Sequence, residues 1–210
     1  GLLIKENRRG THLVHIEASL KDEFDYTLLG YYVGKIVGYG VPVLTGITRH
    51  PSTEELINFC AMSNVSGAIS MFHMPGFTVE ASNLEEAFQG DASGDRIEVT
   101  DNELERTYEE LQTTSGRIDF VMLGCPHYTL KQIEEVARLL NGKKIHDNMS
   151  FLVCTSATTK MLAERIGYLD IIERAGGHVV VDTCIDEPCW IVYKNKVGMT
   201  DSPKCAYYRR

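Results

Sequence analysis

The sequence predicts an α/β fold in which a mostly parallel sheet is flanked by helices. Short apolar runs alternate along the chain with segments whose apolar residues recur at helical spacing, and the loops between them are short. This alternation is typical of βαβ units, because neighbouring parallel strands need a crossover connection that is usually a helix. The chain has 210 residues, of which 43% are hydrophobic and 24% charged, as in ordinary globular proteins.

The first half of the chain alternates in this way from its start. The expected strands cover residues 11–17, 41–45, 67–72 and 96–99. The expected helices cover residues 24–37, 52–64, 83–89 and 100–113. Ser52 with Glu55, and Thr100 with Glu103, form capping boxes at two helix starts. Within the first long helix, glycine recurs every fourth residue from Gly30, which indicates close approach to a neighbouring backbone.

The second half continues the alternation without a repeat or a clear internal domain boundary. The expected strands cover residues 118–123, 150–154, 178–182 and 190–193. The expected helices cover residues 130–140, 158–166 and 169–175. Thr129 and Gln132 form a capping box for the first of these helices, and Gly176 ends the last one.

A cysteine lies at the most distinctive of these junctions. Cys125, Pro126 and His127 fall in a predicted tight turn between a strand end and a helix N-terminus. Backbone N–H groups and the helix dipole at such a place favour a thiolate over a thiol. Cys125 is therefore a candidate metal ligand or nucleophile.

Other polar residues also follow expected strands directly. They are His73, the pair Thr155 and Ser156, and Cys184. Because ligands bind beyond the carboxyl ends of parallel strands, we expect these residues and Cys125 to lie on one sheet edge. Two thiolates there, from Cys125 and Cys184, suit iron–sulfur or zinc ligation.

The residue pattern leaves alternatives open. A zinc site from Cys125, His127, Cys184 and Cys189 is one, and Cys205 is a further candidate ligand. A Cys125–His127 hydrolase dyad is another, although no orienting Asp or Asn is evident. A third alternative is that Cys125 and Cys184 are ordinary loop cysteines that bind no metal. For His73, the alternative to a ligand role is a loop histidine that makes a structural hydrogen bond.

A lysine near the end of the chain is a candidate binding residue. Ser202 and Lys204 lie in a Ser-Pro-Lys turn, where the lysine is suited to hold a carboxylate or phosphate and the hydroxyl to assist. The alternative is a solvated lysine without a ligand.

Charge and composition exclude several classes of protein. The net charge is −8 without a basic patch, which argues against nucleic-acid binding. No apolar run reaches the roughly 20 residues that span a membrane. The six cysteines are spread over a mid-sized chain, which indicates a cytoplasmic protein rather than a disulfide framework.

Five segments together resemble the large subunit of the aconitase X family. They occur in the family's order and cover nearly the whole chain. These segments are GLLIKENRRGTH at 1–12, LGYYVG at 29–34, GCPH at 124–127, DTC at 182–184 and TDSPK at 200–204.

The resemblance implies an aconitase-like hydro-lyase with α/β/α layers. Members of the family include cis-3-hydroxy-L-proline dehydratase and archaeal phosphomevalonate dehydratase, so the expected substrate is a small anionic hydroxy acid such as cis-3-hydroxy-L-proline or (R)-5-phosphomevalonate. The resemblance also implies an iron–sulfur cluster, [4Fe-4S] or [2Fe-2S]. It further implies a heterodimer with a small swivelling subunit, which in some members is fused to the large subunit. Cys125 and Cys184 match cluster-ligating cysteines, and Lys204 matches a substrate-contacting lysine.

The sequence departs from the family in extent. The family's third cluster cysteine lies in a Cys-Thr-Pro-Tyr motif, and Glu-Ser-Ser-Ala and Asn-Arg-Glu-Gly motifs contact substrate; none is present here. We therefore expect a central fragment of the large subunit, incomplete at both ends and inactive alone. The alternatives are a zinc-stabilised α/β binding domain and a non-catalytic domain for subunit docking.

Overall fold

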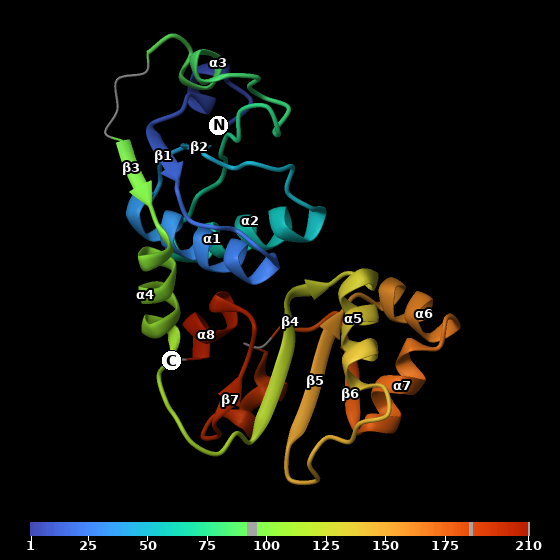
Figure 1. The fold of residues 1–210 in the computed structure, drawn as a ribbon. Coiled ribbons are helices and arrows are strands. Elements are labelled where there is room, and N and C mark those ends of the chain that lie inside the picture. The colour runs from blue at the N-terminus through green and yellow to red at the C-terminus, as the bar shows by residue number, and fades with distance from the viewer. Residues whose placement is uncertain (92–95, 185–186, 210) are drawn as a thin grey trace. The chain divides into compact units, whose positions relative to one another are not determined.

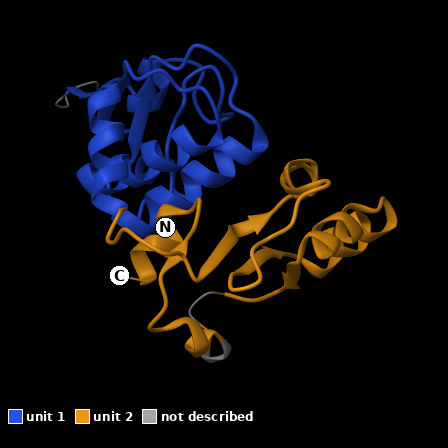
Figure 2. Cartoon of the chain, turned by 60° about the horizontal axis from the view of Figure 1, so that its bottom comes forward, with its two compact units in different colours: residues 1–111 blue, residues 112–210 orange. Residues whose placement is uncertain are grey.

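The computed structural model of the chain describes residues 1–91, 96–184 and 187–209, apart from the side chains at 188 and 189. The chain divides into two units, residues 1–111 and 112–210 (Figure 2). Each unit contains its own parallel sheet and its own apolar core. Every strand pairing in the described part of the chain is parallel, so the predicted α/β class with flanking helices is confirmed.

The first unit is built on a three-stranded sheet with the order β2-β1-β3 (Figure 1). Its strands are β1 (His12–Ile16), β2 (Pro42–Thr45) and β3 (Arg96–Val99). Its helices are the 3₁₀ helix η1 (Lys5–Arg8), α1 (Glu23–Val37), α2 (Thr53–Gly67), α3 (Leu84–Phe88) and α4 (Asp101–Leu111). Successive residues of a strand point to opposite faces, and here Val14 packs with α1, α2 and α4 while Leu13 packs with α3. Helices therefore cover both faces.

Two glycines let α1 and α2 pack closely. A Cβ atom on Gly30 would lie 2.6 Å from the carbonyl oxygen of Phe59, and one on Gly34 would meet the backbone of Ser63. The backbones thus approach to a distance that no larger residue permits. This confirms the close approach predicted from the glycine spacing.

The second unit is built on a four-stranded sheet with the order β6-β5-β4-β7. Its strands are β4 (Phe120–Tyr128), β5 (Ser150–Thr155), β6 (Gly177–Val181) and β7 (Gly198–Met199). Its helices are α5 (Leu130–Leu140), α6 (Ala157–Arg165), α7 (Tyr168–Ala175), the 3₁₀ helix η2 (Pro188–Tyr193) and α8 (Pro203–Arg209).

The sheet of the second unit buries apolar side chains on both faces. Val153 packs against Ile133 of α5 and Ile172 of α7, which lie on one side of the sheet in Figure 1. Its neighbour Cys154 points the other way and packs with Trp190 of η2 and Cys205 of α8. The arrangement gives three layers, with the sheet in the middle.

Two of the predicted strands are wrong. Residues 67–72 form no strand, because α2 continues to Gly67 and Ala68 closes it in a left-handed conformation with φ 58°; only His73 makes an isolated bridge, to Val43. Residues 190–193 belong to η2. Trp190 is buried, but Ile191 and Val192 are 69% and 63% exposed, so the side chains do not alternate as in a strand with one buried face.

One expectation about the sheet is also wrong. His73 belongs to the first unit and Cys125 to the second, so they do not share the edge of one sheet. Alternating strands and helices look the same in a sequence whether they build one sheet or two. None of the described helices combines the length and apolar character needed to cross a bilayer.

Candidate functional site

The site is built around an irregularity in β4. Its pairing with β5 is regular as far as Leu123 and resumes at Tyr128, where Tyr128 faces Thr155. Residues 124–127 thus oppose the single residue Cys154. The extra residues leave the ladder, as in a β-bulge, and re-aim their side chains.

Gly124 makes this irregularity feasible. It has φ 91°, and a Cβ atom at this position would overlap the carbonyl oxygen of Cys154 on β5. The peptide bond between Cys125 and Pro126 is cis. Cys125 therefore lies within β4 rather than in a turn after it, which corrects the predicted position of the strand end.

Hydrogen bonds hold the Cys125 segment beside the loop that contains Cys184. His127 Nε2 lies 2.8 Å from the carbonyl oxygen of Thr183, and Trp190 Nε1 donates to the Thr183 hydroxyl at 3.1 Å. After burial, which is the largest cause, the neighbouring Cys184 also raises the pKa of Cys125. The structure therefore brings together the two cysteines that were paired from their positions after strands.

The environment of the Cys125 thiol differs from the prediction. Burial raises the pKa of Cys125, and the hydrogen bond from Ser202 and the charge of Lys204 offset this only partly. The helix dipole acts mainly within the first turn, and α5 begins at Leu130, beyond the bulge. The predicted preference for a thiolate in the metal-free chain is therefore wrong.

Ser202 is occupied by structural hydrogen bonds. Its hydroxyl donates to the carbonyl oxygen of Cys125 and accepts the backbone N–H of Cys205 at 3.1 Å, which caps the start of α8. Lys204 follows in the first turn of that helix and is partly exposed. The segment that carries both residues therefore lies directly against Cys125.

Two further cysteines pack in the core behind the site. Cys154 is 2% exposed and Cys205 is 3% exposed, in one apolar cluster with Phe120 and Trp190. Burial raises the pKa of each of these two thiols to about 12. Both thiols therefore stay protonated at neutral pH. Cys205, a candidate ligand from the sequence, is thus a residue of the apolar core.

His73 performs a structural role in the first unit. It is 3% exposed, and its Nε2 atom lies 2.7 Å from the carbonyl oxygen of Arg8. Its backbone bonds to Pro42 and Leu44 extend the sheet beside β2.

Tyr128 and Asp201 belong to the site but were not predicted. The Tyr128 hydroxyl donates to Asp201 Oδ2, and burial raises the pKa of that carboxyl group above its usual range. Neither residue type signals such a bond in a sequence, because the two are brought together only by folding.

The donor atoms fit part of a metal centre. No group of three or more His, Cys, Asp or Glu side chains in the described ranges is arranged to hold a metal ion. Cys125 and Cys184 supply two neighbouring thiols, and the side chain of Cys189 is outside the described part. His127 Nε2 bonds to the Thr183 carbonyl oxygen, so a zinc ligand or a base at this position would have to use Nδ1.

Comparisons with known proteins identify the family. The aconitase X second domain matches residues 10–109, and the aconitase X third domain matches residues 118–210. The chain belongs to the aconitase X family. The two matched regions fall in the two units of the structure, and the predicted resemblance is confirmed.

Several aconitase X relatives are similar over most of this chain. The phosphomevalonate dehydratase large subunit of Methanothermobacter thermautotrophicus is 41% identical over 185 residues, which are 88% of this chain and 44% of the relative. That of Methanocaldococcus jannaschii is 36% identical over 99% of this chain and 52% of its own length. The cis-3-hydroxy-L-proline dehydratase of Hypocrea jecorina is 32% identical over 99% of this chain and 36% of its own.

A solved aconitase X structure has the same fold. The holo-form crystal structure from Thermococcus kodakaraensis superposes with a TM-score of 0.86 at 32% identity, covering 99% of this chain and 52% of that one. The chain thus spans about half the length, or less, of the relatives and structure that it matches.

Proposed function

We propose that the protein containing this chain is a dehydratase, a hydro-lyase that removes water from a small hydroxy acid. The support is twofold. Similar proteins of the family are named phosphomevalonate dehydratase and cis-3-hydroxy-L-proline dehydratase. In this chain, two thiols and a lysine meet at the carboxyl end of a parallel sheet, the usual place for a ligand site.

The proposed cofactor is an iron–sulfur cluster, [4Fe-4S] or [2Fe-2S]. Cys125 and Cys184 would hold it, together with at least one ligand from outside the described residues. The single observation that carries this assignment is the juxtaposition of Cys125, in the irregular part of β4, with the loop after β6 that contains Cys184. When bound, such a cluster supplies a Lewis acid for a leaving hydroxyl group.

The burial of the Cys125 thiol affects the proton balance of metal binding. A thiol must lose its proton to become a ligand, and the raised pKa of Cys125 opposes that loss in the metal-free chain. Bound metal would favour the thiolate, so cluster binding is expected to release protons.

Lys204 is the proposed contact for an anionic group of the substrate. Its charge already acts on the Cys125 thiol, so an anion bound to it would lie close to the cluster ligands. The two candidate substrates are cis-3-hydroxy-L-proline and (R)-5-phosphomevalonate, and both carry a carboxylate. The catalytic base is not among the residues assigned.

The proposed partner is the small subunit of an aconitase X enzyme. The similar archaeal proteins are named large subunits, which supports a heterodimer with a separate small subunit or a fused one. By this proposal the 210-residue chain is inactive alone.

The cofactor proposal is tested by removing one thiol at a time. In the full-length protein with its small subunit, purified without oxygen, Cys125→Ser and Cys184→Ser should each lose most of the bound iron, sulfide and visible absorbance. Cys60→Ser is the matched control, because Cys60 is an exposed cysteine of α2 in the first unit and should keep them. Unchanged iron content in both site variants, or stoichiometric zinc without iron in the wild type, would sink the proposal.

The substrate proposal needs a separate measurement. The same complex is incubated with each of the two hydroxy acids, and loss of water is followed by mass spectrometry. Turnover of one compound identifies the substrate class. No turnover of either compound by iron-loaded wild-type complex would reject both candidates.

A further inference from the structure

The segment 200–205 lies on Cys125 and is tied to β4 by two side-chain hydrogen bonds. One runs from the Ser202 hydroxyl to the carbonyl oxygen of Cys125. Behind it, Cys205 packs in the apolar cluster that Cys125 borders. The segment is therefore one of the parts of the unit that pack around Cys125.

The second tie is the bond from the Tyr128 hydroxyl to Asp201 Oδ2. Tyr128 is itself held firmly, because its carbonyl oxygen accepts the Thr155 hydroxyl at 2.7 Å and its backbone pairs with Thr155 in the sheet. Asp201 Oδ1 is buried and has no hydrogen-bond partner among the described residues. The Asp201 side chain is thus anchored through one oxygen, which makes Tyr128 its main point of attachment.

We propose that Tyr128 and Asp201 are positioning residues, whose hydrogen bond holds Lys204 in place beside Cys125. Asp201 lies three residues before Lys204, and only Ser202 and Pro203, both buried, separate them. Movement of Asp201 is therefore passed on to Lys204 through a short, packed segment. The role for Lys204 in substrate binding rests on the proposed function, whereas the covering of Cys125 does not.

The covering of Cys125 is tested without substrate or cluster. The full-length protein is reduced, freed of metal with a chelator and treated with iodoacetamide, and alkylation of each cysteine is followed by peptide mass spectrometry. Tyr128→Phe should raise the rate at Cys125 by about fivefold or more and leave the rate at Cys60 unchanged. An unchanged rate at Cys125 would overturn the proposal.

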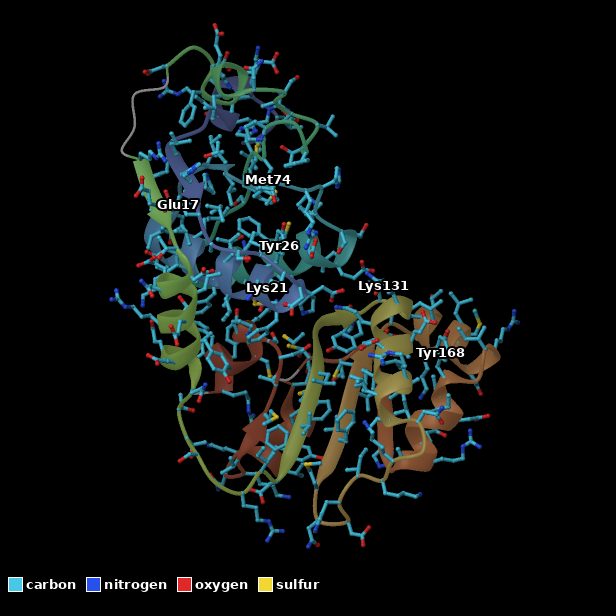
Figure 3. The ribbon with its side chains drawn as sticks, in the orientation of Figure 1. Glu17, Lys21, Tyr26, Met74, Lys131 and Tyr168 are labelled. Atoms are coloured by element: carbon cyan, nitrogen blue, oxygen red, sulfur yellow. The ribbon has the colours of Figure 1, made fainter. Side chains whose placement is uncertain are left out.

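The chain offers a matched control for this substitution. Tyr168 lies at the start of α7 (Figure 3). Like Tyr128, it donates its hydroxyl to a carboxylate, here Glu134 Oε1 at 2.7 Å. Tyr168→Phe removes the same atom and the same kind of bond elsewhere in the same unit. It should leave alkylation of Cys125 as in the wild type; an equal rise would mean that general loosening of the unit is responsible, which overturns the proposal.

Kinetics separate positioning from a purely structural role. In the loaded complex, Tyr128→Phe and Asp201→Ala should raise KM by about tenfold with little change in kcat, because they weaken a contact made to substrate and transition state alike. Asp201→Asn keeps an oxygen that accepts the Tyr128 hydroxyl and should rescue KM. An Asn variant as impaired as the Ala variant would show that the carboxylate itself is needed, and would overturn the proposal.

The experiments distinguish failure of the proposed dehydratase function from failure of the positioning role of Tyr128 and Asp201. Wild-type complex that holds no iron, or that turns over neither compound, rejects the proposed function. The alkylation rates still decide whether the Tyr128–Asp201 bond holds the segment on Cys125.

Discussion

At the scale of single residues, Gly124 is the position on which the shape of the site depends most. It combines a positive φ with contact to the Cys154 backbone, so Gly124→Ala adds both backbone strain and overlap. We expect a loss of about 2–5 kcal/mol in the free energy of unfolding. Urea denaturation measures it.

A matched substitution at Gly142 separates the backbone strain from the steric overlap. It also has a positive φ, 74°, but nothing lies within 4 Å of the place where its Cβ would be. Gly142→Ala should therefore cost about 1–2 kcal/mol, from backbone strain alone. Equal losses at the two glycines would contradict the importance of the contact with β5.

The residues of the site were predictable to the extent that they follow strands. Cys125 and Cys184 could be paired because β4, β5 and β6 are neighbours whose carboxyl ends meet at one edge. The raised pKa of Cys125 could not be predicted, because its main cause is the burial of the thiol in the folded unit. A spacing rule contains no information about which distant segment covers a side chain.

At the scale of elements, the hydrogen bonds at the start of α4 allow a prediction about stability at acid pH. Glu103 accepts the backbone N–H of Thr100 at 3.0 Å and also its hydroxyl, and these bonds lower the pKa of Glu103 below its ordinary value of 4.5. A carboxyl group with a lowered folded-state pKa stabilises the fold above its ordinary pKa. That stabilisation is lost as the pH falls through the folded-state value.

Glu103→Gln should therefore lower the thermal midpoint at pH 7 and have a smaller effect at pH 3, because the carboxyl of the unfolded chain is protonated there and part of the stabilisation is already lost. Thermal melts at the two pH values measure the difference. Glu105→Gln, at an exposed position of the same helix, is the control. A deficit that stays the same at pH 3 would count against the role of the charged carboxylate.

Elements with strong local signals were predicted well, and weak ones were not. The capping boxes at Ser52 and Thr129 appear in the structure with both reciprocal hydrogen bonds, and α2 and α5 begin where they indicate. By contrast, α8 has seven residues, with Cys205 in the same apolar cluster as Phe120 of β4, and β7 has two. Such short elements are stabilised by tertiary packing rather than by their own sequence.

At the scale of the whole molecule, the division into two units has a chemical consequence. Cys125, Cys184 and Lys204 all belong to the second unit, whose sheet brings their loops together. Sequence reasoning set no boundary, although the exposed polar run at 112–116 between α4 and β4 is the kind of segment that joins domains. The alternation of strands and helices continues across it and hides the break.

Each unit has its own buried core, so we expect two unfolding transitions in calorimetry of the chain. Leu29→Ala truncates a fully buried residue of the first core, and Ile172→Ala one of the second. Each should cost about 2–5 kcal/mol and lower the midpoint of one transition by roughly 10 °C or more. Since the two residues belong to separate cores, each substitution should leave the other transition in place; a single transition lowered by both would show that the units unfold as one.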